Sequence, residues 1–313
     1  MYRGLSPAFA ALLRCHKDGR ELRLLDQEQV GQRIERGKLR CSSCDVTYSL
    51  EAGIARILDP GTLDGESAHE LDVRDQQAAR DLDWELSDWN QMDIESTIRA
   101  SEPLRGASVL ELGAGAGRFT VRMVERGAKV LAVDFSLRSL ETVATRVNEA
   151  SPLGLVHADC TKLEVVPDSF DLVASTLMSN LPTERHRANV LRLAASALKQ
   201  GGKFVFSTHH YDIVSRLRGE PRAGHYPKSG IFRYLFDRRS IAAELSPHFA
   251  HFECRPIQIP VPLTGRIGMR VAASRLAERI PLVKQFGALL LITAYKGRPR
   301  AGSRTAQAPH LAR

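Results

Sequence analysis

The sequence predicts an α/β protein with a doubly wound, mostly parallel seven-stranded sheet and a small N-terminal β module that contains cysteines. Three observations lead to this prediction. Short apolar runs alternate with helical segments from residue 107 onward, a glycine-rich loop follows the first run, and Cys41 and Cys44 form a Cys-x-x-Cys pair near the N-terminus. Strands that alternate with helices imply right-handed crossovers and a sheet covered on both faces.

The composition is that of an ordinary globular protein. The chain has 313 residues, of which 43% are hydrophobic and 26% charged, enough for one large domain and one small domain. The longest near-apolar run, residues 286–295, is too short to span a bilayer and predicts a buried strand. Five cysteines, an odd number, favour metal-bound or free thiols in a reducing compartment. No small-residue cleavage motif follows the N-terminal apolar run, so we expect a cytoplasmic protein without a transmembrane segment.

Changes in composition divide the chain into four parts. We expect residues 1–60 to form a compact N-terminal module that ends at the turn-forming stretch DPGTLDG. Residues 61–106 form a linker and an N-terminal helical segment, and residues 107–297 form the α/β domain. Residues 298–313 carry arginines but no acidic residue, and they predict a disordered basic tail.

Periodicity places the elements of the α/β domain in order. We expect strands in the segments 108–115, 129–136, 155–160, 170–178, 203–210, 251–263 and 287–297. Helices are expected at 66–102, 118–127, 137–150, 184–199, 237–245 and, with a break at Pro281, 265–285.

The glycine-rich loop indicates a nucleotide-like ligand. Gly113, Gly115 and Gly117 lie between a strand and a helix, where the chain turns sharply and backbone N–H groups face a ligand. The next strand ends in Asp134, whose carboxylate can accept both hydroxyls of a ribose. A dinucleotide fingerprint requires Gly or Ala at position 118, where this chain has Arg118, and Glu111 disfavours a pyrophosphate.

Five motifs in the right order give the chain a family resemblance. They are ELGAGAG at 111–117, VLAVDFS at 130–136, HADC at 157–160, SFDLVASTLMSNLP at 169–182 and LKQGGKFVFSTH at 198–209. Over roughly residues 66–297 the chain resembles the class I S-adenosylmethionine-dependent methyltransferases. The resemblance implies S-adenosylmethionine as cofactor, with the loop around methionine and ribose, Asp134 on the ribose and Asp159 near the adenine amine. Its implied cofactor-binding residues are Glu111, Gly113, Gly115, Gly117, Asp134, Phe135, Asp159, Cys160 and Ser175.

Two histidines are candidate catalytic bases. His209 and His210 end the fifth strand, and ligands of open parallel sheets lie beyond the carboxyl ends of strands. Imidazole titrates near neutral pH and can take a proton from an acceptor hydroxyl, although a structural or surface role is the alternative for each. Asn180 stands where many relatives of the family carry histidine. The arginine-rich insert 210–236 can bind an anionic acceptor or form a solvated surface.

The N-terminal cysteines predict a structural metal site. Cys41 and Cys44 supply two zinc ligands, Cys15 supplies a third, and Asp18 or His16 supplies the fourth. Residues 10–58 resemble the small zinc ribbon that is fused to, or partnered with, many methyltransferases. A redox dithiol is disfavoured because no thioredoxin-like strand and helix surround the pair, and a metal-free ribbon remains the alternative.

The functional hypothesis is methyl transfer from S-adenosylmethionine to a small-molecule acceptor at oxygen. The acceptor class is a glycan, a lipid precursor or another metabolite. The net charge of +8 is compatible with an anionic acceptor, a nucleic acid, an anionic lipid or a solubilising surface, and charge alone does not choose between them. The alternative is an RNA-directed methyltransferase that uses the ribbon and the basic surface. Against it, STLMSNLP stands where amino-methylating nucleic-acid enzymes carry an N-P-P-Y-type tetrapeptide. A non-catalytic, cofactor-binding partner protein is the third hypothesis.

Overall fold

The computed structural model describes the chain except residues 1, 3, 81–86, 177, 262–269 and 298–313. The segment predicted to be a disordered tail thus lies outside the described residues. Among the described helices, none combines the length and the apolar character needed to cross a bilayer.

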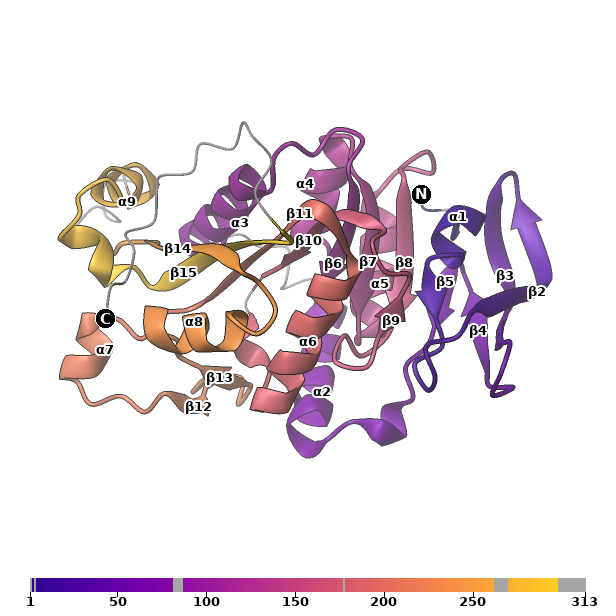
Figure 1. Ribbon diagram of the computed structural model, residues 1–313, viewed down its shortest axis with the longest axis horizontal. Coiled ribbons are helices and arrows are strands. Elements are labelled where there is room, and N and C mark those ends of the chain that lie inside the picture. The colour runs from indigo at the N-terminus through magenta and orange to yellow at the C-terminus, as the bar shows by residue number, and fades with distance from the viewer. Residues whose placement is uncertain (1, 3, 81–86, 177, 262–269, 298–313) are drawn as a thin grey trace.

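A single mixed sheet of eleven strands runs through the molecule (Figure 1). Its order is β14-β15-β11-β10-β6-β7-β8-β5-β4-β3-β2. The first seven strands in this order are those predicted for the α/β domain: β14 (His251–Ile257), β15 (Leu289–Tyr295), β11 (Leu198–His209), β10 (Phe170–Ser175), β6 (Ser108–Leu112), β7 (Lys129–Asp134) and β8 (Leu153–His157). Only β15 runs antiparallel to its neighbours among these seven, since it pairs antiparallel with both β11 and β14. The predicted fold class is confirmed.

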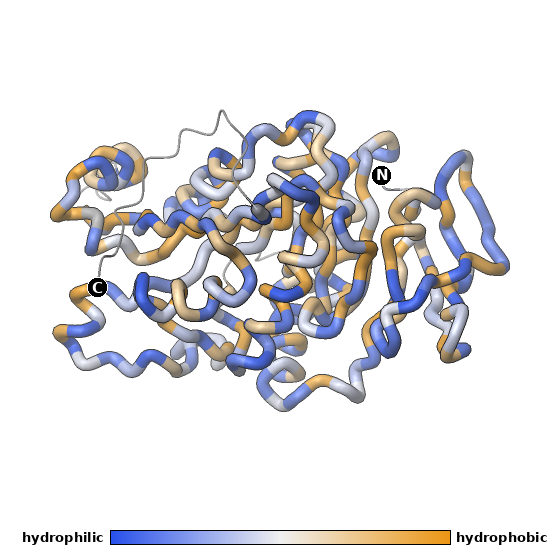
Figure 2. The backbone as a smooth tube through the Cα atoms, in the orientation of Figure 1, coloured by the Kyte–Doolittle hydropathy of each residue, from blue (hydrophilic) through white to orange (hydrophobic). Residues whose placement is uncertain are grey.

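Helices cover both faces of these seven strands, as the alternation of strands and helices predicts. On one face lie α3 (Asp88–Ser101), α4 (Arg118–Glu125) and α5 (Leu137–Arg146), whose apolar side chains share a core with β6, β7 and β8. On the other face lie α6 (Glu184–Ala197) and α8 (Arg238–Leu245). Hydrophobic segments follow the central strands in Figure 2, which is the pattern of a parallel sheet buried on both sides.

The N-terminal module continues the same sheet. It comprises α1 (Pro7–Ala10), β1 (Leu13–Arg14), β2 (Leu22–Val30), β3 (Arg33–Cys41), β4 (Thr47–Glu51) and β5 (Ile54–Arg56). Strand β5 pairs parallel with β8, so Ala55 lies opposite Val156. The guanidinium of Arg33 donates to the carbonyl oxygens of Ser151 at 2.7 Å and Leu153 at 3.0 Å. Strand β1 pairs with β9 (Glu164–Val165), which closes a second contact between the module and the larger domain.

An insert and a helix lie over the carboxyl ends of the central strands. The predicted helical segment 66–102 contains α2 (Gly65–Ala79) and α3, and η1 (Pro60–Thr62) precedes α2. The insert 210–236 contains α7 (Ile213–Leu217) and the hairpin of β12 (Ala223–His225) and β13 (Phe232–Tyr234). Asn180, in η2 (Met178–Asn180), donates through its side-chain amide to the Phe232 carbonyl at 2.9 Å. His225 bonds Glu66 at 3.1 Å, so the hairpin is tied to both α2 and η2.

Of the last predicted helical stretch, 265–285, residues 265–269 lie outside the described residues. Helix α9 covers Arg270–Ala277, and a short 3-10 helix, η4 (Val283–Phe286), follows it. Pro281 lies between the two helices. A continuous helix through this position is disfavoured because the proline ring clashes with the preceding helical turn.

Candidate active site

A cavity of about 170 Å³ opens at the carboxyl ends of β6, β7 and β10. The loop after β6, the end of β7, the segment 158–161, the end of β10 and helix α2 line it. Of the predicted cofactor-binding residues, seven line this cavity: Gly113, Gly115, Asp134, Phe135, Asp159, Cys160 and Ser175. The structure therefore brings residues that are far apart in the sequence to the place where open parallel sheets bind their ligands.

The glycines of the loop have two different physical roles. Gly113 and Gly115 have φ angles of +75° and +51°, and a Cβ on either would meet no atom within 4 Å. They therefore let the chain turn and leave open space where a ligand can approach the backbone. Gly117, with φ +85°, begins α4, and a Cβ there would lie 2.8 Å from Cγ2 of Val143. Gly117 thus permits close packing of α4 on α5 and does not line the cavity.

Asp134 closes the loop from the next strand. Its side chain is 6% exposed, and its two oxygens accept the N–H groups of Gly115 at 2.7 Å and Ser136 at 2.8 Å. Burial raises the pKa of Asp134 to about 6, although these two N–H groups oppose the rise. The carboxylate therefore carries its charge at neutral pH, and each oxygen retains a lone pair for a ligand hydroxyl.

Glu111 lies beneath the loop, outside the cavity lining. Its Oε2 accepts a hydrogen bond from the Thr120 hydroxyl at 2.6 Å, which joins β6 to α4. Burial raises the pKa of Glu111 to about 8, and the nearby charge of Asp134 adds to the rise. The residue thus holds a proton at neutral pH. The structure gives Glu111 a position from which it supports the glycine loop.

The segment after β8 forms the far wall. Oδ1 of Asp159 accepts the backbone N–H of Thr161 at 2.8 Å and the Thr161 hydroxyl at 2.7 Å, which fixes the turn. The thiol of Cys160 is half-buried, and burial raises its pKa well above the usual range, so it stays neutral. Opposite, the Ser175 hydroxyl donates to the Leu112 carbonyl at 2.8 Å and ties the end of β10 to that of β6.

Helix α2 supplies cavity residues that sequence reasoning missed. Glu70 and Arg74 line the cavity and form an ion pair at 3.0 Å one helical turn apart. Burial raises the pKa of Glu70, and the charge of Arg74 opposes that rise. The signal in the sequence was an i, i+4 acid–arginine pair, but the same spacing occurs on solvated helix faces.

His209 is not among the residues that line the cavity, and it is connected to them through Tyr226. Its Nε2 is hydrogen-bonded to the hydroxyl of Tyr226, which belongs to the insert, and Arg233 lies over the Tyr226 ring at 5.5 Å. Burial and the charge of Arg233 lower the pKa of His209 to about 4, so the imidazole is neutral at physiological pH. Tyr226 in turn approaches the side chain of Asn180, which lines the cavity.

The second predicted catalytic histidine lies elsewhere. His210 donates from Nδ1 to the Gly287 carbonyl at 2.7 Å and lines a separate cavity beside Arg216 and Arg222. Successive residues of a strand point to opposite faces, which separates His210 from His209. The structure thus brings only His209 to the residues around the cofactor cavity.

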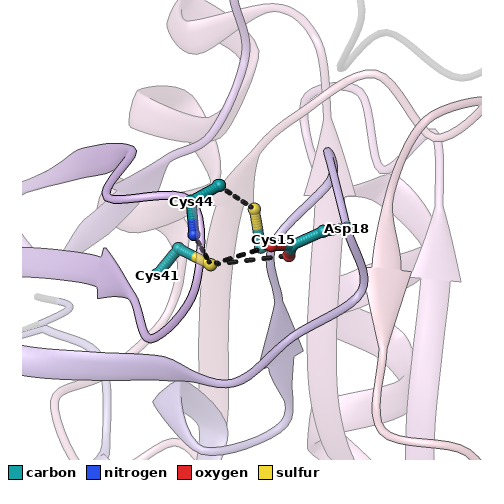
Figure 3. Close-up of side chains that lie close together, drawn as sticks. All are labelled: Cys15, Asp18, Cys41 and Cys44. Atoms are coloured by element: carbon teal, nitrogen blue, oxygen red, sulfur yellow. Dashed lines mark hydrogen bonds between the residues drawn. The ribbon is translucent and has the colours of Figure 1, made fainter.

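The four predicted metal ligands converge in the N-terminal module (Figure 3). One ligand atom from each of Cys15, Asp18, Cys41 and Cys44 lies within 4.8 Å of the others. The sulfurs of Cys15 and Cys44 are 3.6 Å apart, and Oδ1 of Asp18 is 3.4 Å from the Cys41 sulfur. Thiolates around tetrahedral zinc are about 3.8 Å apart, so the donor set fits this ion. His16 bonds the Tyr48 hydroxyl at 2.9 Å instead, which leaves Asp18 as the fourth donor.

Fold and cavity together resemble those of the class I S-adenosylmethionine-dependent methyltransferases. Residues 109–202 match the family model described as a methyltransferase domain. This match covers the glycine loop, Asp134, the segment after β8 and the ends of β10 and α6. The cofactor of the class is S-adenosylmethionine, and the open cradle at Gly113 and Gly115 beside Asp134 fits it.

Individual relatives match the same part of the chain. The demethylmenaquinone methyltransferase of Clavibacter sepedonicus is 35% identical over 125 residues, which are 39% of this chain and 50% of that protein. The ubiquinone biosynthesis O-methyltransferase of Idiomarina loihiensis is 32% identical over 130 residues, 40% of this chain and 51% of that protein. The chain therefore spans about half the length of the curated relatives it matches.

One solved structure shares the fold over a longer stretch. It is a chain from the complex between the Haloferax volcanii Trm112 methyltransferase activator and a proposed methyltransferase. It is 16% identical, with a TM-score of 0.53, and the match covers 72% of this chain and 98% of that chain. At this identity the likeness concerns the fold alone.

The buried acid at position 111 predicts a pH dependence of stability. With a pKa of about 8, folded Glu111 keeps a proton that an unfolded chain releases near pH 4.5. Between these values the unfolded state binds fewer protons, so this group's contribution to stability falls as pH rises from about 4.5 to about 8. Glu111→Gln, which keeps an acceptor for Thr120, removes this loss.

We therefore expect the melting temperature of Glu111→Gln, relative to that of the native chain, to be several degrees higher at pH 9 than at pH 5. Glu125→Gln, at the end of α4, is the control and is expected to show no such trend. A constant difference between Glu111→Gln and the native chain across this range would contradict the buried, protonated state.

Proposed function

We propose that this protein transfers a methyl group from S-adenosylmethionine to a hydroxyl of a small anionic acceptor. The observation that carries the proposal is the cavity itself. Its inner part is lined by Gly113, Gly115 and Asp134, and its side toward the hairpin is bordered by Asn180. The O-methyltransferase relative from Idiomarina loihiensis supports oxygen as the methylated atom.

Some groups of the chain would bind the cofactor, and others would align the acceptor. The cofactor supplies an electrophilic methyl group on sulfur, so the protein chiefly has to align a nucleophile with it. Asp134 would accept ribose hydroxyls, and the segment at Asp159 and Cys160 would contact the adenine. Backbone N–H groups of the glycine loop would face the methionine part.

On the acceptor side, His209 would receive the proton of the acceptor hydroxyl. Its imidazole is neutral, and its Nε2 is directed to the Tyr226 hydroxyl, which belongs to the segment that carries Arg233. Arg233, which lies over the Tyr226 ring, brings positive charge to this side, which favours an acceptor with a phosphate or carboxylate. His210 has no catalytic part in this proposal because it lines the other cavity.

We also propose that zinc holds the N-terminal module together and that the module supports the adenine side of the site. The module's β5 and β1 pair with β8 and β9, which flank the segment 158–163. Lys162 donates to the carbonyl of Thr62 at 2.6 Å across this junction.

The cofactor proposal predicts a loss of binding in Asp134→Ala. Removal of the carboxylate that would accept ribose hydroxyls is expected to weaken S-adenosylmethionine binding by about tenfold to a hundredfold, measured by calorimetry. Asp72→Ala, an exposed acid on α2, is the control and should bind as the native chain does. Native protein that binds no S-adenosylmethionine would refute the proposal.

Transfer itself is measured with methyl-labelled cofactor and a cell extract separated into RNA, lipid and small-molecule fractions. We expect label in the small-molecule or lipid fraction, and less of it with Asp134→Ala. Label confined to RNA would instead support the RNA-directed alternative.

The base proposal predicts a selective loss of turnover. With the labelled acceptor as substrate, His209→Asn is expected to lower kcat by about a hundredfold or more while S-adenosylmethionine binding stays native. Because the pKa of His209 is about 4, the native rate should show no acid-side fall between pH 8 and about pH 5. His248→Asn, three residues beyond the end of α8, is the control. Unchanged kcat in His209→Asn would exclude the base role.

The zinc proposal predicts one equivalent of metal per chain. Elemental analysis of native protein is expected to find zinc near stoichiometry, and Cys41→Ser and Asp18→Ala are expected to lower it. His16→Ala should retain the metal because His16 is bonded to Tyr48. Less than about a tenth of an equivalent in native protein, unaltered by Cys41→Ser, would refute a zinc site.

A further inference from the structure

A second, larger cavity lies outside the methyltransferase site. Its volume is about 680 Å³, and it shares no lining residue with the cofactor cavity. The start of α7, the start of α8 and the segment before η4 line it. Its charged lining consists of four arginines and two aspartates: Arg216, Arg222, Arg238, Arg239, Asp212 and Asp237.

The two aspartates are already engaged. Asp237 accepts hydrogen bonds from Arg222 at 2.5 Å and from Arg216 at 3.2 Å, so one carboxylate serves two guanidinium groups. Asp212 caps α7 by accepting the backbone N–H of Ser215 at 2.8 Å. Within the described part of the chain, no carboxylate lies within 4.0 Å of the guanidinium of Arg238 or Arg239. The cavity therefore has an excess of positive charge that is available to a ligand.

Two of the arginines are held in place before any ligand binds. The guanidinium of Arg222 lies 4.6 Å from the centre of the Tyr211 ring, and that of Arg216 lies 5.6 Å from it. Such stacking on an aromatic ring restricts the side chains, so less conformational freedom is lost when they bind an anion. Guanidinium groups pair with phosphate oxygens in a planar, two-bond geometry.

Exposed apolar side chains surround this cavity. They lie on α7, on α9 and between α9 and η4, which occupy one end of the molecule (Figure 1). Most of the exposed large hydrophobic side chains of the described chain are here: Ile213, Leu217, Leu276, Ile280 and Leu282. Leu217 and Leu282 are 82% and 77% exposed. The remaining two, Leu25 and Val30, lie on the β2–β3 hairpin.

Helix α9 leaves its larger apolar side chains in solvent because it packs through small ones. Ser274 and Ala277 are its buried residues, and the Ser274 hydroxyl accepts the backbone N–H of Ile259 at 2.8 Å. Leu276 is 64% exposed on the other side. The small residues of α9, and not its larger apolar ones, thus pack against the core.

We propose that this end of the molecule, formed by α7, α9 and the arginine cavity, docks on the surface of an anionic phospholipid bilayer. Leucines that project from short turns can enter the boundary between headgroups and acyl chains. Arginines close to the surface are attracted by the negative potential of anionic lipids, and the cavity would hold a lipid phosphate. The proposal does not depend on the methyltransferase function, since it uses none of the residues of that site.

Charge complementarity favours a bilayer over a protein partner. The exposed leucines on α7 and beyond α9 are separated by the arginine cavity and do not form one continuous apolar face. Stable protein interfaces have a central apolar patch that is depleted of charged residues. Separate exposed leucines on either side of an arginine-lined cavity suit a bilayer surface, where lipid phosphates lie above the hydrocarbon chains.

The test is sedimentation of the full chain with vesicles of phosphatidylcholine alone and of phosphatidylcholine mixed with phosphatidylglycerol. We expect binding to the mixed vesicles at least about tenfold tighter than to phosphatidylcholine. The double variant Arg238→Ala/Arg239→Ala should weaken binding to mixed vesicles by about tenfold or more. Leu217→Asn/Leu282→Asn should also weaken it, including at high salt, where attraction between charges is screened.

Matched controls distinguish a specific surface from general charge and hydrophobicity. Arg23→Ala/Arg36→Ala removes the same charge from the β2–β3 hairpin, and Leu25→Asn/Val30→Asn removes exposed apolar side chains there. Both controls are expected to bind vesicles as the native chain does. All variants change exposed positions, so native melting temperatures are expected and confirm folding.

Three outcomes would overturn the proposal. The first is equal binding of native protein to both vesicle types, or no binding. The second is a control variant that loses as much binding as its counterpart. The third is native vesicle binding by the leucine variant together with competition by inorganic phosphate, which would indicate a soluble phosphorylated ligand instead of a bilayer.

Discussion

Backbone hydrogen bonding between β5 and β8 is the interaction on which the two halves of the molecule depend. Without β5, strand β8 would be the edge of the parallel sheet and would expose unpaired N–H and C=O groups. Pairing of Ala55 with Val156 continues the sheet into the module. Residues 158–161, which line one wall of the cavity, follow β8 directly, so the same pairing that joins the module to the larger domain also fixes one side of that cavity.

Burial of three acidic side chains carries an electrostatic cost in the folded chain. Glu111, Asp134 and Asp93 are all buried, and burial raises the pKa of each carboxyl group. Hydrogen bonds offset part of this cost: the Thr120 hydroxyl donates to Glu111, and the Ser207 hydroxyl donates to Asp93 at 3.2 Å. Of these three groups only Asp134 lines the cavity, so a ligand that hydrogen-bonds its carboxylate would offset that part of the cost.

Much of the fold could be predicted because local sequence encodes it. The apolar runs of β6, β7 and β10 and the glycines after β6 fix strand, turn and helix within short windows. The cofactor residues at the ends of these strands followed from the same pattern. The four candidate metal ligands, Cys15, Asp18, Cys41 and Cys44, could also be predicted, because cysteines are rare and their spacing restricts their partners, and the structure brings these side chains together.

Contacts between distant segments could not be predicted in this way. Nothing in residues 54–56 indicates that β5 pairs with a strand about a hundred residues later, because parallel pairing leaves no turn signature. Glu70 and Arg74 resembled an ordinary surface pair until α2 was seen over the cavity. The choice between Asp18 and His16 as the fourth candidate metal ligand likewise depended on Tyr48, whose hydroxyl is hydrogen-bonded to the His16 imidazole.

The end of β11 places two adjacent histidines in two unrelated environments. His209 meets Tyr226 beside the cofactor cavity, and His210 lines the arginine cavity on the other side. The side chains of His209 and His210 thus lie on opposite faces of the strand and near different cavities. Strand geometry, and not a domain hinge, fixes this arrangement. A single-residue insertion before His209 would turn each histidine to the opposite face of the strand. The register of this strand therefore constrains both cavities.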